Sequence, residues 1–333
     1  MTELNNAFDT FHDRISLGAT PWSKIESAFG GLRSYLTDAC DLPEDAVLLQ
    51  GSVCNATAVE PAEPDGEYDA DVIAICAAPD ASADQALDDL EAVLAAHGSY
   101  AALIKKEGAR KKPCVRLRYA GDSVGGFHVD VVPARASQSS DVQAPLEAPR
   151  RGDGWHDTAP EEYTAWCAER GERFARTVKM LKRWREVHQP AHASIKSIVL
   201  QVLAADAVGS QTSDGVALCA TLEEMQTRLS ASPDSAPQIP NPVLAREDLG
   251  ARWTDAAYRN FRKELDEAVD LAQQALWCTD DAESHGLWQE LLGDDFPAAP
   301  TEAAKRVRIP PSVPAPGFER TPQEPPRRER YGR

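Results

Sequence analysis

Three aspartates stand on two short, otherwise apolar segments, and this placement constrains the chain more than any other feature. Asp69 and Asp71 lie in EYDADVIAI, and Asp130 lies in FHVDVVPA. Both segments are rich in Val and Ile and are predicted to be strands. Side chains at positions i and i+2 of a strand point to the same face, so Asp69 and Asp71 should emerge together, with Cα atoms roughly 6.5–7 Å apart. Carboxylates in such surroundings are costly unless a positive charge neutralises them.

A pair of divalent cations is the usual partner for such a set of carboxylates. Hard cations bound by carboxylate oxygens suit chemistry at a phosphate. The alternative interpretation is that Asp69 begins a turn, while Asp71 and Asp130 end their strands facing water. The D-x-D pattern is common and does not decide between these two interpretations by itself.

The segment QGSVCNATAV, upstream of the acids, adds a second signal. Gly51 and Ser52 follow the predicted strand VLLQ. Glycine lets backbone amides approach a phosphate closely, and a serine hydroxyl with a following helix N-terminus can donate to phosphate oxygens. Most Gly-Ser pairs are plain turns. Gly-Ser, a D-x-D seventeen residues after Ser52, and a third Asp on a later strand form a much more specific pattern.

The chain divides into four zones by pattern. Residues 1–45 are predicted to be helical, residues 46–135 to hold short strands around one amphipathic helix, and residues 155–295 to be mainly helical. Residues 301–333 contain seven Pro, eight basic and four acidic residues. A tail of that composition is predicted to be extended or flexible. The fold class expected from these zones is α+β.

Charge and cysteine content narrow the function further. The 333 residues include 35 Lys and Arg against 53 Asp and Glu, a formal charge of −18. This acidity argues against a nucleic-acid partner, although it does not exclude a pocket for one small phosphate ligand. Seven cysteines without a CxxC pattern indicate reduced thiols rather than disulfides or zinc. No apolar run is long enough for a membrane span and no signal sequence is recognisable, so we expect a cytoplasmic protein without a membrane partner.

These motifs resemble the polymerase-beta-like nucleotidyltransferase superfamily. In finer detail they resemble the cGAS/DncV-like nucleotidyltransferases (CD-NTases) of bacterial anti-phage signalling. The resemblance covers about residues 20–275 and rests on QGSVCNAT, EYDADVIAI, GFHVDVVPA, WHDTAPEEYTAWC, VKMLKRWRE, IKSIVL and NPV…EDLGARW.

The resemblance implies a bilobal fold with the active-site cleft between its lobes. A nucleotidyltransferase core, a mixed sheet of five or six strands flanked by helices, would occupy residues 1–150 together with the N-terminal helix. A helical, oligoadenylate-synthetase-like subdomain would occupy residues 151–300, followed by the Pro/Arg-rich tail at 301–333.

The resemblance also implies roles for individual residues. The catalytic acids would hold two Mg²⁺ ions, for which Mn²⁺ can substitute, and other residues would contact the donor triphosphate. Lys196 would read the base or merely carry a helix-face charge, and Ile198 replaces an aromatic residue that often stacks on the base. On pattern alone, Lys182 is equally well explained as a solvated helix lysine. The residues carried over are Asp69, Asp71 and Asp130 for the metals, and Gly51, Ser52, Lys182, Lys196 and Ser197 for the nucleotide.

The implied function is synthesis of a cyclic di- or trinucleotide second messenger from NTPs such as ATP, with release of pyrophosphate. The product would activate an effector in anti-phage defence, and accessory or effector proteins of a defence operon are possible partners. Three alternatives stay open. The chain could make linear oligonucleotides or modify a protein, RNA or small molecule; it could be an inactive nucleotide-binding module; or its tail could be the functional element that docks a partner.

Three further features carry weaker predictions. A basic run could line the entry of a second nucleotide but is better explained as a solvated hairpin. His128 alternates onto the face of Asp130, where a filling role is favoured over a ligand-orienting one. Gly332 near the C-terminus is a candidate site for an accessory enzyme, although Arg333 and not glycine ends the chain. The basic run consists of Lys105, Lys106, Arg110, Lys111, Lys112, Arg116 and Arg118.

Overall fold

The computed structural model divides the chain into a compact unit, residues 1–299, and a second unit, residues 300–333. The predictions for the tail and for Gly332 lie outside the described part of the chain, as does the basic run from Lys105 to Lys112. The structure describes residues 3–63, 66–104, 113–122, 125–138, 145–211 and 213–300.

A four-stranded mixed sheet carries the three aspartates. Its order is β1-β2-β4-β3, in which β2 and β4 are parallel and the two outer strands are antiparallel to their neighbours. The strands are β1 (Val47–Gln50), β2 (Glu67–Ala74), β3 (Val115–Asp122) and β4 (Gly125–Pro133).

A second sheet in the described part of the chain is separate from the first. Its order is β5-β6-β7, with antiparallel pairing throughout. The expected single sheet of five or six strands is therefore wrong for the described residues, because the chain leaves the first sheet after β4. The three short strands are β5 (Arg135–Ala136), β6 (Leu146–Arg150) and β7 (Gly154–Thr158).

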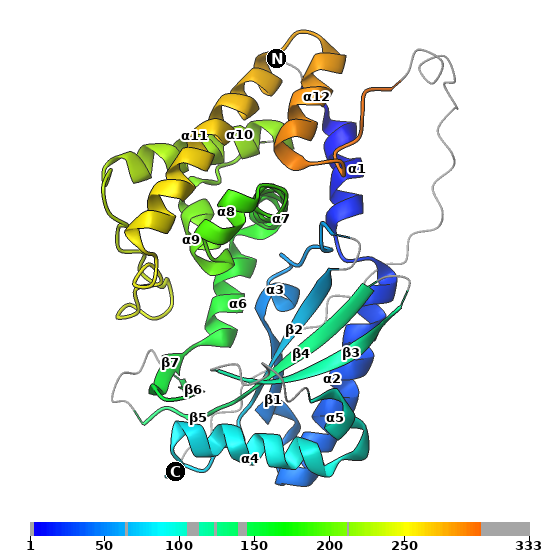
Figure 1. The fold of residues 1–333 in the computed structure, drawn as a ribbon, viewed down its shortest axis with the longest axis vertical. Helices are drawn as coiled ribbons and strands as arrows, with labels where there is room; N and C mark the ends of the chain where they lie inside the picture. The colour runs from blue at the N-terminus through cyan, green and yellow to red at the C-terminus, as the bar shows by residue number, and fades with distance from the viewer. Residues whose placement is uncertain are drawn as a thin grey trace. The chain divides into compact units, whose positions relative to one another are not determined.

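One face of the four-stranded sheet is apolar and packed. Tyr68, Ala70 and Val72 alternate along β2 and lie in one hydrophobic cluster with side chains of two helices. These helices are α2 (Ala19–Cys40) and α4 (Ala83–Ala96), which lie with the sheet in the lower part of Figure 1. The alternation turns Asp69 and Asp71 to the opposite face, as the sequence predicts.

The helical part forms a second hydrophobic cluster around α7 (Gly171–Val187). The predicted stripe Phe174, Val178, Leu181 and Arg185 is buried along this helix. The first helix, α1 (Asn5–Ile15), packs its Phe and Ile side chains into this cluster rather than into the sheet. The remaining helical segments are η1 (Glu44–Ala46), α3 (Gly51–Cys54), α5 (Gly98–Leu103), α6 (Pro160–Glu169), α8 (Gln189–Ser194), α9 (Ser197–Ala207), α10 (Asp214–Ser230), α11 (Asp255–Trp277) and α12 (Asp281–Leu292).

Helix α6 leads from β7 to α7, so the polypeptide crosses here from the sheets to the helical cluster (Figure 1). A hydrogen bond also joins the two parts, from the Thr164 hydroxyl on α6 to the Asn55 side chain after α3, at 2.9 Å. In the described part of the chain, no helix is long and apolar enough to cross a membrane.

Candidate active site

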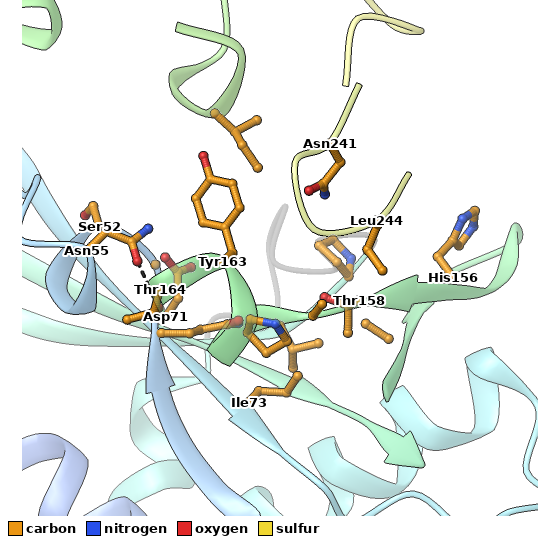
Figure 2. A pocket seen from close by; sticks show the side chains of 18 of the residues that line it. Ser52, Asn55, Asp71, Ile73, His156, Thr158, Tyr163, Thr164, Asn241 and Leu244 are labelled. Carbon is orange, nitrogen blue, oxygen red and sulfur yellow. Dashed lines mark hydrogen bonds between the residues drawn. The ribbon is translucent and has the colours of Figure 1, made fainter. Parts of the chain in front are cut away.

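A cavity of about 460 Å³, here called the first cavity, opens between the sheet and the helical cluster. Asp69 and Asp71 line it from β2, Gly51 and Ser52 from α3, and Lys182 from α7. Figure 2 shows Tyr163 and Asn241 facing the same space from α6 and from the loop before α11. Residues more than one hundred positions apart thus share one space.

Gly51 is required by the backbone at the start of α3. Its φ is +74°, in the region that favours glycine. A Cβ atom at this position would lie 2.1 Å from Oδ2 of Asp71, so no larger residue fits without moving the carboxylate. The first residue of the Gly-Ser pair therefore lies directly against the second acid of the D-x-D pair.

Asp71 carries the most perturbed carboxyl group of the site. Burial, together with the negative charges of Asp69 and Asp130, raises the pKa of Asp71 to about 7. Asp130 is its direct neighbour across the parallel β2–β4 pairing. The three predicted metal ligands thus share one face of the sheet, and their mutual repulsion outweighs the nearby cations.

Arg116 neutralises the third acid. Asp130 is its antiparallel partner on β4, and the guanidinium donates from Nε to Oδ1 and from Nη2 to Oδ2, each at 2.6 Å. Both oxygens of Asp130 are engaged by this bidentate pair, and Asp130 is not among the residues that line the first cavity. The sequence predicted the acid but not its partner.

The three carboxylates fit a hard divalent cation, although Arg116 competes for one of them. All three side chains offer carboxylate oxygens, which such cations prefer. Burial and the charges of Asp69 and Asp130 favour the protonated form of Asp71, and a bound cation would favour its ionised form instead. No group of three or more His, Cys, Asp or Glu in the described residues is close enough to form a metal site as it stands. Arg116 uses one acceptor site on each oxygen of Asp130, so it competes with a cation for this carboxylate.

Lys182 is buried rather than solvated. Its side chain is 6% exposed, and Nζ donates to the Thr57 carbonyl at 2.8 Å. Burial lowers the pKa of Lys182 to about 8, against the opposing influence of Asp69. The interpretation of Lys182 as a solvated helix lysine is therefore wrong. The contact also fixes the loop that follows Gly51 and Ser52 to α7.

The two neighbouring residues of IKSIVL take different places. Ser197 is the first residue of α9, lines the first cavity, and accepts a hydrogen bond from Nη1 of Arg185 at 2.9 Å. Lys196 is exposed and lines an adjoining cavity with Arg246 and Arg252. The structure therefore brings Ser197, but not Lys196, to the first cavity.

Several lining residues were missed by the sequence reasoning. Tyr163 is buried, and burial raises its pKa above the ordinary range. Asn241 is held by Glu247, to which its side-chain amide donates at 2.7 Å. Both lie in stretches that carry the resemblance, but their place in the cavity depends on how distant segments pack, which no local pattern reports.

His128 lies on the predicted face but is packed against neighbours. It is 8% exposed, and Nδ1 is 3.4 Å from Glu67, which also pairs with Arg118 at 3.3 Å. Burial and Arg116 lower the pKa of His128. The favoured filling role agrees with this packing.

Comparison with known proteins gives the family. The SMODS family, described as Second Messenger Oligonucleotide or Dinucleotide Synthetase domain, matches residues 1–171. A "c-di-GMP synthase" of Roseivirga ehrenbergii is 23% identical over 295 residues, covering 78% of this chain and 76% of the relative. A "Cyclic AMP-AMP-AMP synthase" of an Acinetobacter species is 27% identical over 150 residues, covering 43% of this chain and 44% of the relative.

Solved structures show the same fold. The CD-NTase CdnG of Bradyrhizobium diazoefficiens in complex with GTP superposes with a TM-score of 0.71 at 17% identity, covering 88% of this chain and 96% of that one. The cyclic AMP-GMP synthase DncV of Vibrio cholerae gives a TM-score of 0.58 at 14% identity, covering 88% of this chain and 87% of that one. The expected nucleotidyltransferase core with a helical part is thereby confirmed. On this fold, and with a family match that covers half of its length, the chain belongs to the SMODS family of CD-NTase-type nucleotidyltransferases, the synthases of cyclic oligonucleotide second messengers.

Proposed function

We propose that this chain joins NTPs into a cyclic di- or trinucleotide, with Mg²⁺ as cofactor and pyrophosphate as the second product. The observation that carries the proposal is the juxtaposition of Asp69 and Asp71 with Ser52, Lys182 and Ser197 around the first cavity. The acids on one side of the cavity have no complete counter-charge within the protein, so they suit a metal ion. The hydroxyl and ammonium groups on the other side suit the phosphates that this metal would bind.

In this proposal the cavity holds the donor triphosphate between the sheet and α7. Ser52 and Ser197 donate hydroxyl hydrogen bonds to its oxygens, and Lys182 supplies a charge-assisted one. The glycine at position 51 leaves room for the Asp71 carboxylate at the cavity. Mg²⁺ bound by Asp69, Asp71 and Asp130 would supply Lewis-acid polarisation of the phosphates and lower the pKa of the attacking hydroxyl.

The bond changes follow from this arrangement. The ribose hydroxyl oxygen of an acceptor nucleotide forms a bond to the donor α-phosphorus, and its proton passes to solvent. The bond from the α-phosphorus to the bridging oxygen breaks, and pyrophosphate leaves with the electron pair. Lys182 and Ser197 stabilise the charge that grows on this leaving group. A second round within the linear intermediate closes the ring.

The names of relatives support NTPs as substrates. CdnG was solved with GTP, and the CdnC protein of Escherichia coli was solved with ATP. CdnC was also solved in complex with a HORMA protein, which supports accessory proteins as partners of this chain. We further propose a division into a core at 1–150, a helical subdomain at 151–300 and a tail, with a cytoplasmic role in defence through an effector that reads the product.

Incubation with the four NTPs and Mg²⁺, followed by mass analysis, tests the proposal. We expect a cyclic product and two pyrophosphates per two nucleotides joined in a ring. Addition of EDTA should stop the reaction and excess Mg²⁺ or Mn²⁺ should restore it. A linear product alone, or no consumption of any NTP by folded protein, would contradict the proposal and favour one of the alternatives.

A further inference from the structure

A second cavity, of about 260 Å³, lies next to the first one. The side chains of Ser52, Asp69, Lys182 and Ser197 line both cavities, so they form the boundary between them. The groups proposed to contact the donor triphosphate are therefore reached from two sides. In the proposed arrangement the nucleoside occupies the larger first cavity, and the second cavity lies at the phosphate end of the donor.

Arg185 lines this second cavity and not the first. It lies one helical turn after Lys182 on α7 and is 9% exposed. Its Nη1 donates to the Ser197 hydroxyl at 2.9 Å, and its Nε has no hydrogen-bond partner among the described residues. A buried guanidinium with an unused donor at a cavity wall is a costly arrangement for packing alone.

The contact with Arg185 determines what Ser197 can do. Arginine has donors only, so the serine oxygen must accept, and its own proton remains available for another acceptor. Ser197 also lines the first cavity, where the proposed acceptor is a phosphate oxygen. Arg185 therefore holds the hydroxyl in the donating role.

The second cavity is lined by four acids and by the cations Lys182 and Arg185. Glu67 is paired with Arg118 and His128, and Glu186 is paired with Arg183. Of the other two acids, Asp69 is a ligand of the proposed Mg²⁺, whose charge offsets it, and Glu63 lies on the cavity wall. Lys182 and Arg185 are two cations buried within one helical turn of each other, and their mutual repulsion would be relieved by a bound anion. A planar guanidinium matches the paired oxygens of a phosphate group.

We propose that the second cavity is a pyrophosphate subsite, in which Arg185 binds the leaving group directly and positions the Ser197 hydroxyl. This inference rests on the proposed function, since it concerns the β- and γ-phosphates of the same donor. The second cavity would give pyrophosphate an exit that does not pass through the first cavity. Pyrophosphate could then depart while the linear intermediate stays bound for ring closure.

Calorimetric titration of the full chain with inorganic pyrophosphate and Mg²⁺ tests the subsite without requiring turnover. Arg185→Gln should weaken pyrophosphate binding by about tenfold or more, because a charge-assisted bidentate contact is lost. Arg185→Lys should give an intermediate loss, because the charge stays but the planar fork is removed. Arg183→Lys is the matched control. Arg183 is also buried on α7, at 1% exposure, contacts Glu60, Glu186 and Asp295, and lines neither cavity.

A double-mutant cycle separates the direct contact from the positioning role. If Arg185 acts on pyrophosphate itself, Arg185→Gln combined with Ser197→Ala should bind more weakly than Ser197→Ala alone. Equal affinities of these two variants would overturn the direct contact. Unchanged binding by folded Arg185→Gln, or an equal loss in Arg183→Lys, would overturn the subsite. Should Arg185→Gln fail to fold, Arg185→Lys and the Ser197→Ala pair give the same comparison.

Product inhibition supplies an independent readout. In the proposed reaction, Arg185→Gln should raise the pyrophosphate concentration needed for half-inhibition by the same factor as the calorimetric loss, more than it raises the KM of the acceptor nucleotide. If the wild type makes no product from any NTP but binds pyrophosphate through Arg185, the proposed function fails and the subsite stands. If product forms but Arg185→Gln binds pyrophosphate as tightly as the wild type does, only the proposed subsite is contradicted.

Discussion

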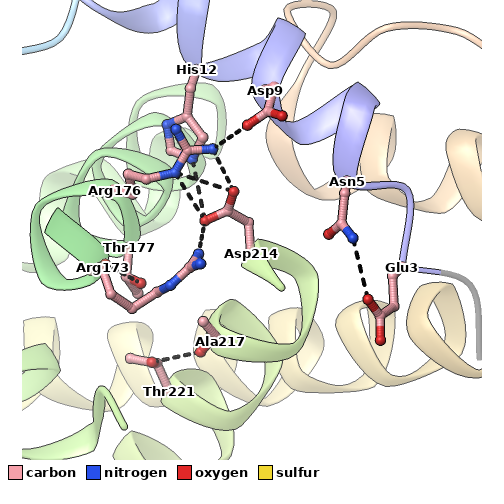
Figure 3. Close-up of polar contacts among 10 residues, drawn as sticks. All are labelled: Glu3, Asn5, Asp9, His12, Arg173, Arg176, Thr177, Asp214, Ala217 and Thr221. Carbon is pink, nitrogen blue, oxygen red and sulfur yellow. Dashed lines mark hydrogen bonds and ion pairs between the residues drawn. The ribbon is translucent and has the colours of Figure 1, made fainter. Parts of the chain in front are cut away.

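Asp71 in the first cavity and Asp214 at the start of α10 are both carboxylates withdrawn from water, yet their pKa values move in opposite directions. Burial and two neighbouring acids raise the pKa of Asp71 to about 7. Burial also acts on Asp214, but hydrogen bonds from Arg176 and the charge of Arg173 hold its pKa below the ordinary value. The cluster of Asp9, Arg173, Arg176 and Asp214 is here called the ion cluster (Figure 3).

The difference separates an acid whose charge is balanced within the fold from one whose charge is not. The ion cluster joins α1, α7 and α10 and carries its own counter-charges. At Asp71 the counter-charge is incomplete, because Lys182 and Arg116 lower its pKa less than burial, Asp69 and Asp130 raise it, and Arg116 is paired with Asp130. An acid whose charge is balanced by neighbouring residues is explained by packing, whereas the unbalanced Asp71 at a cavity supports the proposed cation.

Replacing both acids of the D-x-D pair gives the largest expected effect on activity. Asp69→Asn with Asp71→Asn should reduce product formation below detection, because the proposed metal ligands are lost. Thermal stability should stay equal or rise, because the variant removes carboxylate repulsion. Mass analysis of products and thermal denaturation check the two parts. Retention of most of the activity would contradict the proposed site.

Asp214→Asn tests the ion cluster and should lower the stability of the protein rather than its activity. Removing one partner of a buried pair leaves Arg173 and Arg176 without their shared acid, so the free energy of unfolding should fall by about 3 kcal/mol. Urea denaturation measures this loss. The control is Asp206→Asn, which breaks an exposed pair with Arg228 and should cost less than about 1 kcal/mol. Equal losses in both variants would remove the distinction between the clusters.

Stability without divalent cations should depend on pH in opposite ways at the two places. His12 packs 3.8 Å from Asp214, but burial and Arg176 lower its pKa to about 4, so it is neutral in the fold. Between pH 4 and 6.5 the unfolded chain binds this proton more, so the His12 contribution makes stability rise with pH. Asp71 binds its proton more in the folded state between pH 4 and 7, so its contribution falls with pH.

Single variants should reveal these two slopes. In EDTA, the free energy of unfolding of Asp71→Asn should rise with pH more steeply than that of the wild type. The free energy of unfolding of His12→Gln should instead fall as the pH rises. The change across pH 4 to 6.5 should be on the order of 2 kcal/mol for each. Denaturation curves at fixed pH values measure it. The same slope in both variants would show that neither group titrates as its surroundings predict.

Arg116→Gln should give the smallest of these effects, a stronger stabilisation of the protein by added metal ions. Without the guanidinium, both oxygens of Asp130 become available, so added Mn²⁺ should raise the melting temperature by about 1–2 °C more than in the wild type, which corresponds to roughly 1 kcal/mol. Arg118→Gln, which changes the next arginine on the same face of β3, is the control. An unchanged Mn²⁺ response would show that Arg116 does not compete with the cation.

Local patterns in the sequence were enough to predict much of this molecule. Alternation along β2 gave the common face of Asp69 and Asp71, and helical spacing gave the buried stripe of α7. Gly51 followed from the need for a close approach. Each of these properties depends on neighbours within a few residues, where side-chain direction is set by the backbone period.

What the sequence did not predict depends on register and on contacts between distant elements. The pairing of Arg116 with Asp130 requires the β3–β4 register, and the contact of Arg185 with Ser197 requires the packing of α9 on α7. The ion cluster needs three helices, two of them more than one hundred and fifty residues apart in the chain. The division of the strands into two sheets likewise depends on where the chain turns after β4.

The Arg116–Asp130 pair has a consequence for the order in which the molecule folds. Its partners are 14 residues apart on adjacent antiparallel strands, a contact that a hairpin forms on the microsecond scale. Asp71 reaches Asp130 only through the parallel β2–β4 pairing, which must close a far longer loop and is slower for that reason. We therefore expect Asp130 to be paired with Arg116 before Asp69 and Asp71 reach it, so that the forming sheet does not have to bring three unpaired carboxylates together.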